Sequence, residues 1–333
     1  MKEVKLRTKQ VLGLLLAPLL WLFNSCSPIG DAVDKDRSNN YYFGKGKKDI
    51  FYSRGGNWFA LGKTALNADV PSFKVLGAEI ARDKNHLYYQ SVIVDASSLD
   101  MKSLFTTNGP YADNLLMDKN GVFYIAYEKT KDYAAIAKPI KNADPNTFQR
   151  KDFNWANDHQ NWYYRNQLIA VHYDSFDVLS EFFSKDRSNA YYHYGDVFQD
   201  LEAHYPTFDI MEHKNYAMDK ETVYFMNYDA TDNFKNTKVI KIVSEGQKPK
   251  FLSEVFLTIG EKVYCNGNLL DITTSEAEVV GEFYLKNKSK VYYFDQLLED
   301  ADATTFTENE KGFIGDTTSF YRGTERFRLD KEK

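Results

Sequence analysis

The sequence predicts an all-β protein built from tandem β-hairpin repeats. Three observations favour this class. A short aromatic phrase recurs nine times in the 333 residues, a polar turn rich in Asp precedes most copies, and no stretch after the N-terminus keeps a sustained period near 3.6 residues. A single hairpin cannot bury its own apolar face, so neighbouring units must stack.

Each copy of the phrase places a Tyr or Phe between two residues that are mostly apolar or aromatic. Because side chains alternate faces along a strand, the middle ring points one way and its two neighbours the other, which predicts strands covered on both sides. Consecutive copies are 28 to 40 residues apart, within the usual range of repeat architectures. The copies are Ile50-Phe51-Tyr52, Leu87-Tyr88-Tyr89, Val122-Phe123-Tyr124, Trp162-Tyr163-Tyr164, Ala190-Tyr191-Tyr192, Val223-Tyr224-Phe225, Val263-Tyr264-Cys265, Val291-Tyr292-Tyr293 and Ser319-Phe320-Tyr321.

Two kinds of turn punctuate the repeats. Four residues before the phrase stands an Asp or Asn whose side chain can hydrogen-bond to the nearby backbone and close a hairpin turn. These residues are Asp83, Asp118, Asp158, Asp186, Asp219 and Asn287. A closing turn ends on a Phe that we expect to enter the core, at Phe73, Phe148, Phe208 and Phe306. The copies at 259–265 and 315–321 lack the Asp-Lys-Asn turn. Residues 35–42 nearly repeat 185–192, and their register is left open.

The stacked units favour an open solenoid-like or superhelical array, with a closed β-propeller-like ring as the alternative. The eroded first and last copies resemble caps, which only an open array requires. The phrases Asp83-Lys84-Asn85-His86-Leu87-Tyr88-Tyr89 and Ala143-Asp144-Pro145-x-Thr147-Phe148 resemble the bacterial DKNYY repeat family over roughly residues 34 to 325. That resemblance supplies no catalytic residues.

The N-terminus differs from the body. Basic residues precede an apolar run of about 13 residues, from Val11 to Phe23, which is short for a membrane span and typical of a signal-peptide core. A small residue directly before Cys26 resembles a bacterial lipobox, so we expect lipidation at Cys26. The predicted organisation is a signal peptide (1–25), a lipidated tether (26–33) and one repeat domain (34–333). Ordinary secretion and an uncleaved anchor are the alternatives.

Composition disfavours several activities. The net charge is −5, and no run of Lys or Arg suited to phosphate binding exists, which argues against nucleic acid. The six His residues have no metal-ligand spacing, and no phosphate-binding loop or nucleophile elbow occurs. We predict no cofactor, no metal and no enzymatic activity. Cys265 replaces an aromatic residue of the phrase and is interpreted as a buried small hydrophobe.

The remaining signal is aromatic surface, since 24 Tyr, 24 Phe and 4 Trp are present. Exposed rings can stack on sugars or anchor a protein interface, although core packing is the default. The candidate exposed rings are Trp58, Trp155, Trp162, Tyr111, Tyr173 and Tyr205.

The leading functional hypothesis is a membrane-anchored lipoprotein of the bacterial cell envelope, periplasmic or surface-exposed. Its repeat body would bind another envelope protein through a repeat face and through the insertions 127–139 and 228–248, which are expected to be dispensable for folding. A glycan-binding surface lipoprotein that uses exposed aromatic rings is the second hypothesis, and an envelope hydrolase is the least favoured.

Overall fold

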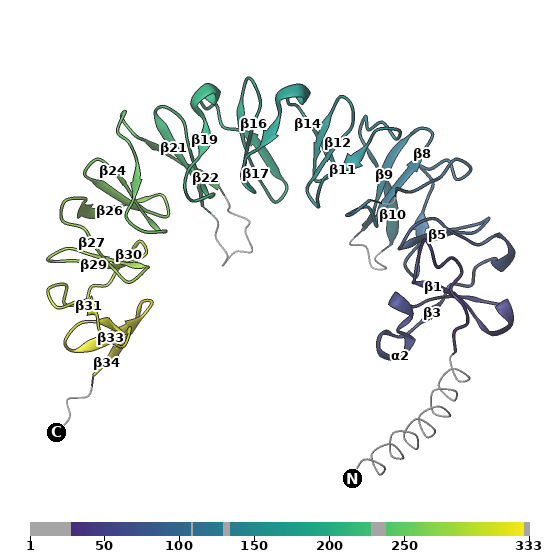
Figure 1. Ribbon diagram of the computed structural model, residues 1–333, viewed down its shortest axis with the longest axis horizontal. Helices are drawn as coiled ribbons and strands as arrows, with labels where there is room; N and C mark the ends of the chain where they lie inside the picture. Colours follow the sequence, from purple (N-terminus) through teal and green to yellow (C-terminus); the bar gives the residue numbers. More distant parts are fainter. Residues whose placement is uncertain (1–27, 108, 129–133, 228–237, 330–333) are drawn as a thin grey trace, which may run out of the picture. The chain divides into compact units, whose positions relative to one another are not determined.

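The computed structural model describes residues 28–107, 109–128, 134–227 and 238–329. The described chain is almost entirely β, in small sheets that follow one another along the sequence and are mostly antiparallel, which confirms the predicted class (Figure 1). It divides after Ala170 into two compact units.

The first unit contains three sheets. The first has the order β1-β2-β3, the second is seven-stranded with the order β4-β5-β6-β7-β10-β9-β8, and the third runs from β11 to β14. The strands are β1 (Tyr41–Phe43), β2 (Ile50–Tyr52), β3 (Thr64–Ala65), β4 (Lys74–Val75), β5 (Ile80–Arg82), β6 (Leu87–Tyr89), β7 (Val92–Asp95), β8 (Leu115–Asp118), β9 (Gly121–Tyr127), β10 (Ala135–Ile140), β11 (Gln149–Arg150), β12 (Trp155–Asn157), β13 (Trp162–Tyr164) and β14 (Gln167–Ile169). The helical turns are η1 (Lys45–Lys47), η2 (Arg54–Gly56), α2 (Trp58–Leu61) and η3 (Val70–Ser72).

The second unit contains five four-stranded sheets, the fourth to the eighth in chain order, each with its strands in sequence order. The strands are β15 (Asp177–Val178), β16 (Phe183–Lys185), β17 (Ala190–Tyr194), β18 (Val197–Asp200), β19 (Asp209–Ile210), β20 (Tyr216–Met218), β21 (Thr222–Asn227), β22 (Lys238–Val243), β23 (Lys250–Phe251), β24 (Phe256–Ile259), β25 (Lys262–Cys265), β26 (Asn268–Thr273), β27 (Glu278–Val280), β28 (Tyr284–Lys286), β29 (Val291–Tyr293), β30 (Gln296–Leu297), β31 (Thr307–Glu308), β32 (Ile314–Gly315), β33 (Ser319–Arg322) and β34 (Glu325–Arg328). Two short turns, η4 (Tyr173–Ser175) and η5 (Tyr205–Thr207), precede the fourth and fifth sheets.

The aromatic phrase forms an interior strand, as expected. Each of the nine copies lies on a different strand, and the middle ring is buried in most of them. In the sixth sheet the middle ring, Tyr264, shares a core with Val223 of the fifth sheet. The first residue of the same phrase, Val263, faces the other way and shares a core with Leu285 and Tyr292 of the seventh sheet. Alternation along one strand therefore joins a sheet to both of its neighbours.

The last copy is one residue out of the predicted register. The Asp316 N–H donates to the Ser319 carbonyl at 2.9 Å, as the Asp83 N–H does to His86, so the hairpin closes one residue later than the aromatic alignment assumes. The ring in the middle position is consequently Tyr321, which is buried. This copy lacks the Asp-Lys-Asn spelling but keeps an Asp turn.

The near-copy at 35–42 is not a separate repeat. Tyr41 and Tyr42 lie on β1, which pairs with β2 so that Tyr42 is opposite Phe51. In the second sheet the residue in that place is Ala81, opposite Tyr88. The likeness to 185–192 therefore falls on the strand before the phrase.

One connection joins two repeats into a single sheet. β10 pairs with β9 in antiparallel register and also lies parallel to β7, with Ala135 opposite Val94. Ala135 and Ala137 are buried in the same core as Leu87. A large part of the predicted insertion at 127–139 is thus a structural strand, and in the second insertion β22 buries Ile242. The expectation that either whole segment is dispensable for folding is wrong, because its deletion would remove a paired strand.

Candidate functional site

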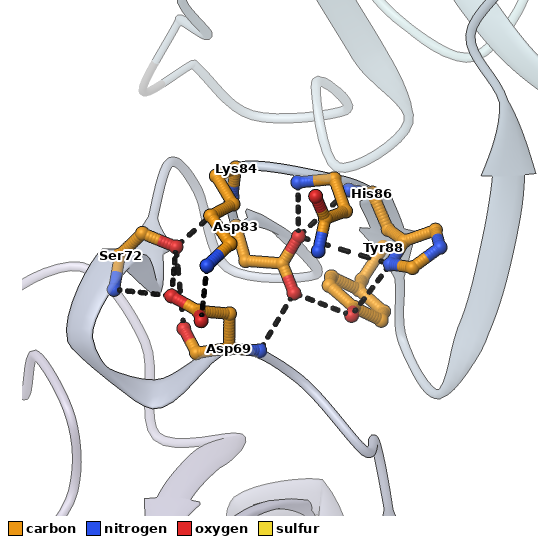
Figure 2. A network of polar contacts seen from close by, with 7 residues as sticks. Asp69, Ser72, Asp83, Lys84, His86 and Tyr88 are labelled. Carbon is orange, nitrogen blue, oxygen red and sulfur yellow. Dashed lines mark hydrogen bonds and ion pairs between the residues drawn. The ribbon is translucent and has the colours of Figure 1, made fainter.

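The most regular polar constellation is the Asp turn between the second and third strands of a repeat. Asp83 is only 2% exposed. Its Oδ1 accepts the N–H groups of Asn85 and His86, both at 2.7 Å. Its Oδ2 accepts the N–H of Asp69 at 2.8 Å and the hydroxyl of Tyr88 at 2.9 Å (Figure 2). One carboxylate therefore closes the hairpin, holds the preceding closing turn and orients the middle ring of the phrase.

The closing turn completes this contact from its own side. The Ser72 hydroxyl donates to Asp69 Oδ1 at 2.6 Å and accepts the N–H of Lys84 at 3.0 Å. The Lys84 ammonium lies 2.7 Å from Asp69 Oδ2, although the Lys side chain is largely exposed (Figure 2). An ion pair this exposed contributes little to stability because water screens it. The two turns are therefore held together by hydrogen bonds, namely the Asp69 N–H donated to Asp83 and the Lys84 N–H donated to Ser72.

The same four-contact arrangement recurs in both units. It is complete at Asp158, Asp186 and Asp219. Asp118 makes the three N–H contacts but has Phe123 in place of the Tyr that would donate a hydroxyl. In the seventh sheet Asn287 accepts two N–H groups through its Oδ1. Asp316 holds its closing turn, but the Tyr321 hydroxyl has no hydrogen-bond partner within the described part of the chain.

The electrostatics of these turns disfavour proton-transfer chemistry. Burial of Asp83 acts to raise its pKa, but three N–H groups and the Tyr88 hydroxyl outweigh it, so the pKa lies below its usual value. Burial and the hydrogen bond to the carboxylate raise the pKa of Tyr88. At neutral pH the carboxylate is therefore charged and the phenol neutral, and both are engaged in contacts that build the fold.

The one cysteine among the described residues, Cys265, is also engaged in packing. Cys265 is fully buried, and burial together with the charge of Asp295 raises the pKa of its thiol to about 12. A thiol in that state is a packing residue and not a nucleophile. Within the described residues, no group of three or more His, Cys, Asp and Glu side chains is placed to hold a metal ion.

The three predicted Trp rings do not form an exposed row. Trp155 is 6% exposed, so its predicted exposure is wrong: it lies on β12 against the ring of Tyr164, with centroids 4.9 Å apart. Trp162 is partly buried on β13, and Trp58 is partly buried on α2. By strand register, Trp155 holds the position that is buried core in the second sheet, at Ile80.

The three predicted Tyr rings are more accessible. Tyr205 is exposed in η5 and Tyr173 is partly buried in η4, where they hold the same place in two successive closing turns. Tyr111 is exposed and meets Phe153, which is 75% exposed, with ring centroids 4.5 Å apart. Tyr111 and Phe153 thus form a small exposed pair in the first unit, and Phe153 is not among the predicted residues.

Sequence reasoning also missed the apolar side chains of the outer edge strands. Leu269 on β26 is 60% exposed, and Leu297 on β30 is likewise exposed. They lie opposite the middle rings of their repeats, Tyr264 and Tyr292. The available signal was an apolar residue shortly after the phrase, beyond the hairpin turn.

Several predictions fall outside the described residues. Cys26, the signal peptide 1–25 and the start of the tether lie there, as do residues 129–133 and 228–237 of the two insertions. Among the residues that are described, no helix is long and apolar enough to cross a membrane.

Comparison with known proteins gives one result. Residues 183–325, from the start of β16 to the start of β34, match the DKNYY family. The match supports DKNYY-type repeats for that part of the chain, and the same Asp turn recurs in the sheets before it. No curated protein and no solved structure matches the chain significantly.

Proposed function

We propose that the chain is a lipid-anchored protein of the bacterial cell envelope, with a non-catalytic β-repeat body that binds a protein partner along its outer edge strands. The observation that carries the binding mode is the parallel pairing of β10 with β7. It is an example, within this chain, of the outer strand of a repeat that accepts an additional strand.

The other sheets offer comparable edges. β14, β18, β22, β26, β30 and β34 each end their sheet without a further paired strand among the described residues. Such an edge can pair its backbone N–H and C=O groups with an extended peptide, while alternate side chains provide specificity. On β26 and β30 the exposed Leu269 and Leu297 would add apolar contacts beside the backbone pairing.

The use of the repeated carboxylates supports a scaffold over an enzyme. The pKa values of Asp83, Asp158, Asp186 and Asp219 all lie below the usual value, because hydrogen bonds to both oxygens outweigh burial. A hydrolase would need other reactive groups gathered in a cleft, with pKa values shifted towards their catalytic task. The most regular polar feature of the chain therefore serves folding.

The binding mode is tested by adding charge to the edges. Full-length protein carrying Leu269→Lys and Leu297→Lys is compared with wild type for capture of envelope proteins from a detergent extract of the source cell. Lysine on an edge strand opposes the addition of another strand. We therefore expect the double variant to fail to capture a partner protein that wild type captures saturably. The matched control is Leu252→Lys, which changes an exposed Leu between β23 and β24. Equal capture by all three proteins would refute edge binding.

The anchor is tested separately. Cys26→Ser removes the thiol that lipidation requires, so we expect labelled palmitate to be incorporated into wild type alone and the variant to leave the membrane fraction. A variant that stays labelled and membrane-bound would contradict lipidation at Cys26.

A second candidate function, glycan binding, is favoured by the exposed pair Tyr111 and Phe153. Adjacent exposed rings can stack on the faces of sugar rings. Trp155 is two residues from Phe153 in the chain, so a bound glycan is expected to change tryptophan fluorescence in wild type and not in Phe153→Ser. A silent titration across acidic and neutral polysaccharides would exclude this function.

A further inference from the structure

The sheets of the second unit stack through a repeated set of apolar side chains. In the seventh sheet this set is Tyr284 on β28, Val291 on β29 and Leu298 after β30, all of them buried. Phe306 and Tyr321 of the following repeat cover them in one core. We call the three side chains that a sheet turns towards the next one its stacking triad.

Strand register identifies the first member of the same triad in the eighth sheet. Val291 is opposite Lys286 in the seventh sheet, and Phe320 is opposite Gly315 in the eighth. Both are the first residue after the Asn or Asp turn closes, so Phe320 corresponds to Val291.

The other two members follow from their pairing. Phe313 lies two residues before Gly315, as Tyr284 lies two residues before Lys286. Phe327 is opposite Phe320 in the eighth sheet. In the seventh sheet the residue paired with Val291 is Leu298, whose N–H donates to the Val291 carbonyl. Phe327 therefore corresponds to Leu298. The stacking triad of the eighth sheet is therefore the three rings Phe313, Phe320 and Phe327.

These rings pack on each other and stay open to solvent. Phe313 is 53% exposed, and Phe320 and Phe327 are partly exposed. The centroids of Phe320 and Phe327 are 4.8 Å apart, with ring planes only 8° apart. Beside them lies a hollow of about 340 Å³ that is lined by Phe313, Phe320, Leu329 and several polar side chains. A capping repeat is expected to carry a polar outer face, whereas the core of this face is apolar.

The internal stacking indicates what such a face accepts. A covered triad meets the middle aromatic of the next sheet and the Phe of the closing turn, as Tyr284 and Val291 meet Tyr321 and Phe306. The contact is heterologous, because the two faces that meet are different. A face of the complementary kind is present on the first sheet, whose middle ring, Phe51, is partly exposed.

Lys63 and the α2 segment, which lies between β2 and β3 in the chain, add further side chains to the first sheet. The Lys63 ammonium lies 4.1 Å from the centroid of the Phe51 ring. On α2, Phe59 is 87% exposed and Leu61 is also exposed. An ammonium held on such a face can also interact with the π-faces of the rings in an aromatic triad. The first sheet therefore offers both apolar and cationic contacts that suit three Phe rings.

Charge favours a head-to-tail contact over a contact between two first sheets. Residues 41–65 carry five basic side chains against one acidic side chain, namely Lys45, Lys47, Lys48, Arg54, Lys63 and Asp49. Residues 305–329 carry four acidic and four basic side chains, namely Glu308, Glu310, Asp316, Glu325, Lys311, Arg322, Arg326 and Arg328. Two first sheets would repel each other, whereas the eighth sheet has no net charge to oppose the first.

We propose that the aromatic face of the eighth sheet, formed by Phe313, Phe320, Phe327 and Leu329, docks the first sheet of a second copy of this chain, head to tail. The contact repeats between molecules the stacking that joins consecutive sheets within a unit. A heterologous contact leaves one face of each kind free, so it propagates into larger oligomers or closes into a ring. Phe327 lies on β34, one of the proposed binding edges, but this assembly uses the side chains of a sheet face whereas edge binding uses the backbone of the edge, so neither requires the other, and neither requires lipidation.

The contact is tested first by cross-linking of the full-length protein in detergent micelles. The photoreactive analogue benzoylphenylalanine replaces Phe313, and cross-linked peptides are identified by mass spectrometry. We expect cross-links to peptides within residues 41–65 of another copy. The same analogue at Leu252, which is exposed between β23 and β24, is the control and should not give those peptides.

Affinity is then measured by sedimentation velocity. Phe313→Ser combined with Leu329→Ser should raise the dissociation constant about tenfold or more, because two large apolar side chains lose their burial. Leu252→Ser should leave the dissociation constant unchanged. Circular dichroism checks that the variants keep a β spectrum, and the cross-linking result does not depend on them. Cross-links only between two eighth sheets, cross-links only to a different protein, or a wild type that is monomeric at all concentrations would each overturn the proposal.

Discussion

The replacement of Asp158 gives the most direct quantitative prediction. Its Oδ1 accepts the N–H groups of Gln160 and Asn161 at 2.8 and 2.7 Å. Its Oδ2 accepts the Tyr163 hydroxyl at 2.8 Å and the N–H of Asp144 at 3.2 Å. The side-chain amide of Asn161 also donates to both oxygens, at 3.3 Å. Because Asp158 is almost fully buried, Asp158→Ala would leave five donors without their acceptor in a site largely closed to water.

The size of the effect follows from those contacts. A hydrogen bond to a charged group contributes about 1.5 to 3 kcal/mol, and losses at one residue are not additive. We expect Asp158→Ala to lower the free energy of unfolding by about 4 kcal/mol, near the upper end of single substitutions. Asp158→Asn keeps the Oδ1 acceptor but turns an amide N–H towards the Asp144 N–H, so we expect about 2 kcal/mol. Tyr163→Phe removes one hydrogen bond to the charged carboxylate and should cost about 1.5 kcal/mol.

The assay is urea denaturation followed by tryptophan fluorescence. Trp155 and Trp162 lie on the two strands that the Asp158 turn connects, so their emission reports the third sheet directly when Trp21 and Trp58 are replaced by Phe in all proteins compared. The ranking of the three variants is the critical result. Equal losses for Asp158→Ala and Asp158→Asn, or a loss below about 1 kcal/mol for Asp158→Ala, would refute the view that this carboxylate ties the two turns together.

Three further predictions concern pH, a thiol and a glycine. Burial acts to raise the pKa of Asp158, but its hydrogen-bond donors outweigh burial and lower the pKa. The stability that Asp158 contributes should therefore be constant above the unfolded pKa of about 4 and be lost as the pH falls further. Acid titration of the Asp158→Asn variant should accordingly show a shallower loss of stability than wild type. Burial raises the pKa of the Cys265 thiol to about 12, so Cys265 should resist iodoacetamide at mildly alkaline pH in the folded protein and react only in denaturant. Mass spectrometry of its peptide measures the labelling, and rapid labelling under native conditions would contradict its burial. Gly267 has φ +77°, and a Cβ there would lie 2.7 Å from the Ile240 side chain. Gly267→Ala should therefore lower the free energy of unfolding in urea by about 2 kcal/mol, against about 1 kcal/mol for the control Gly246→Ala, whose φ is +75° with open space around it. Equal losses would show that no clash exists.

The aromatic pattern predicts strands better than the turns that join them. Alternation about the middle aromatic sets the two faces of a strand, because a period of two is a local property, and Tyr88 and Tyr163 are buried as expected. The one-residue shift at Tyr321 is not predictable from that pattern, since both Phe320 and Tyr321 satisfy it. The deciding signal is Asp316, which lies five residues before Tyr321 as Asp83 lies five residues before Tyr88.

The candidate surfaces are less predictable, because exposure depends on which repeat lies next to a residue. Trp155 is buried although it is predicted as an exposed ring, and its counterpart in the second sheet, Ile80, is buried too. Phe313 holds the corresponding position in the eighth sheet and is exposed. Corresponding positions of different repeats thus differ in exposure, and the sheet that covers Trp155 or Ile80 is not specified by any local sequence pattern.

Within a repeat, the residues that make up the recurring pattern build the fold, and other residues are available for binding. The recurring pattern therefore does not indicate what the chain binds. Asp83 and Tyr88 are hydrogen-bonded to each other, so a substitution at either residue would lower stability whatever the chain binds. Residues free to vary with a partner are those that the turn leaves outside, such as Leu269 opposite Tyr264 or Phe313 on the last triad. Loss of capture or of assembly without loss of stability is therefore expected only from this second group, and that contrast separates a binding role from a structural one in the experiments above.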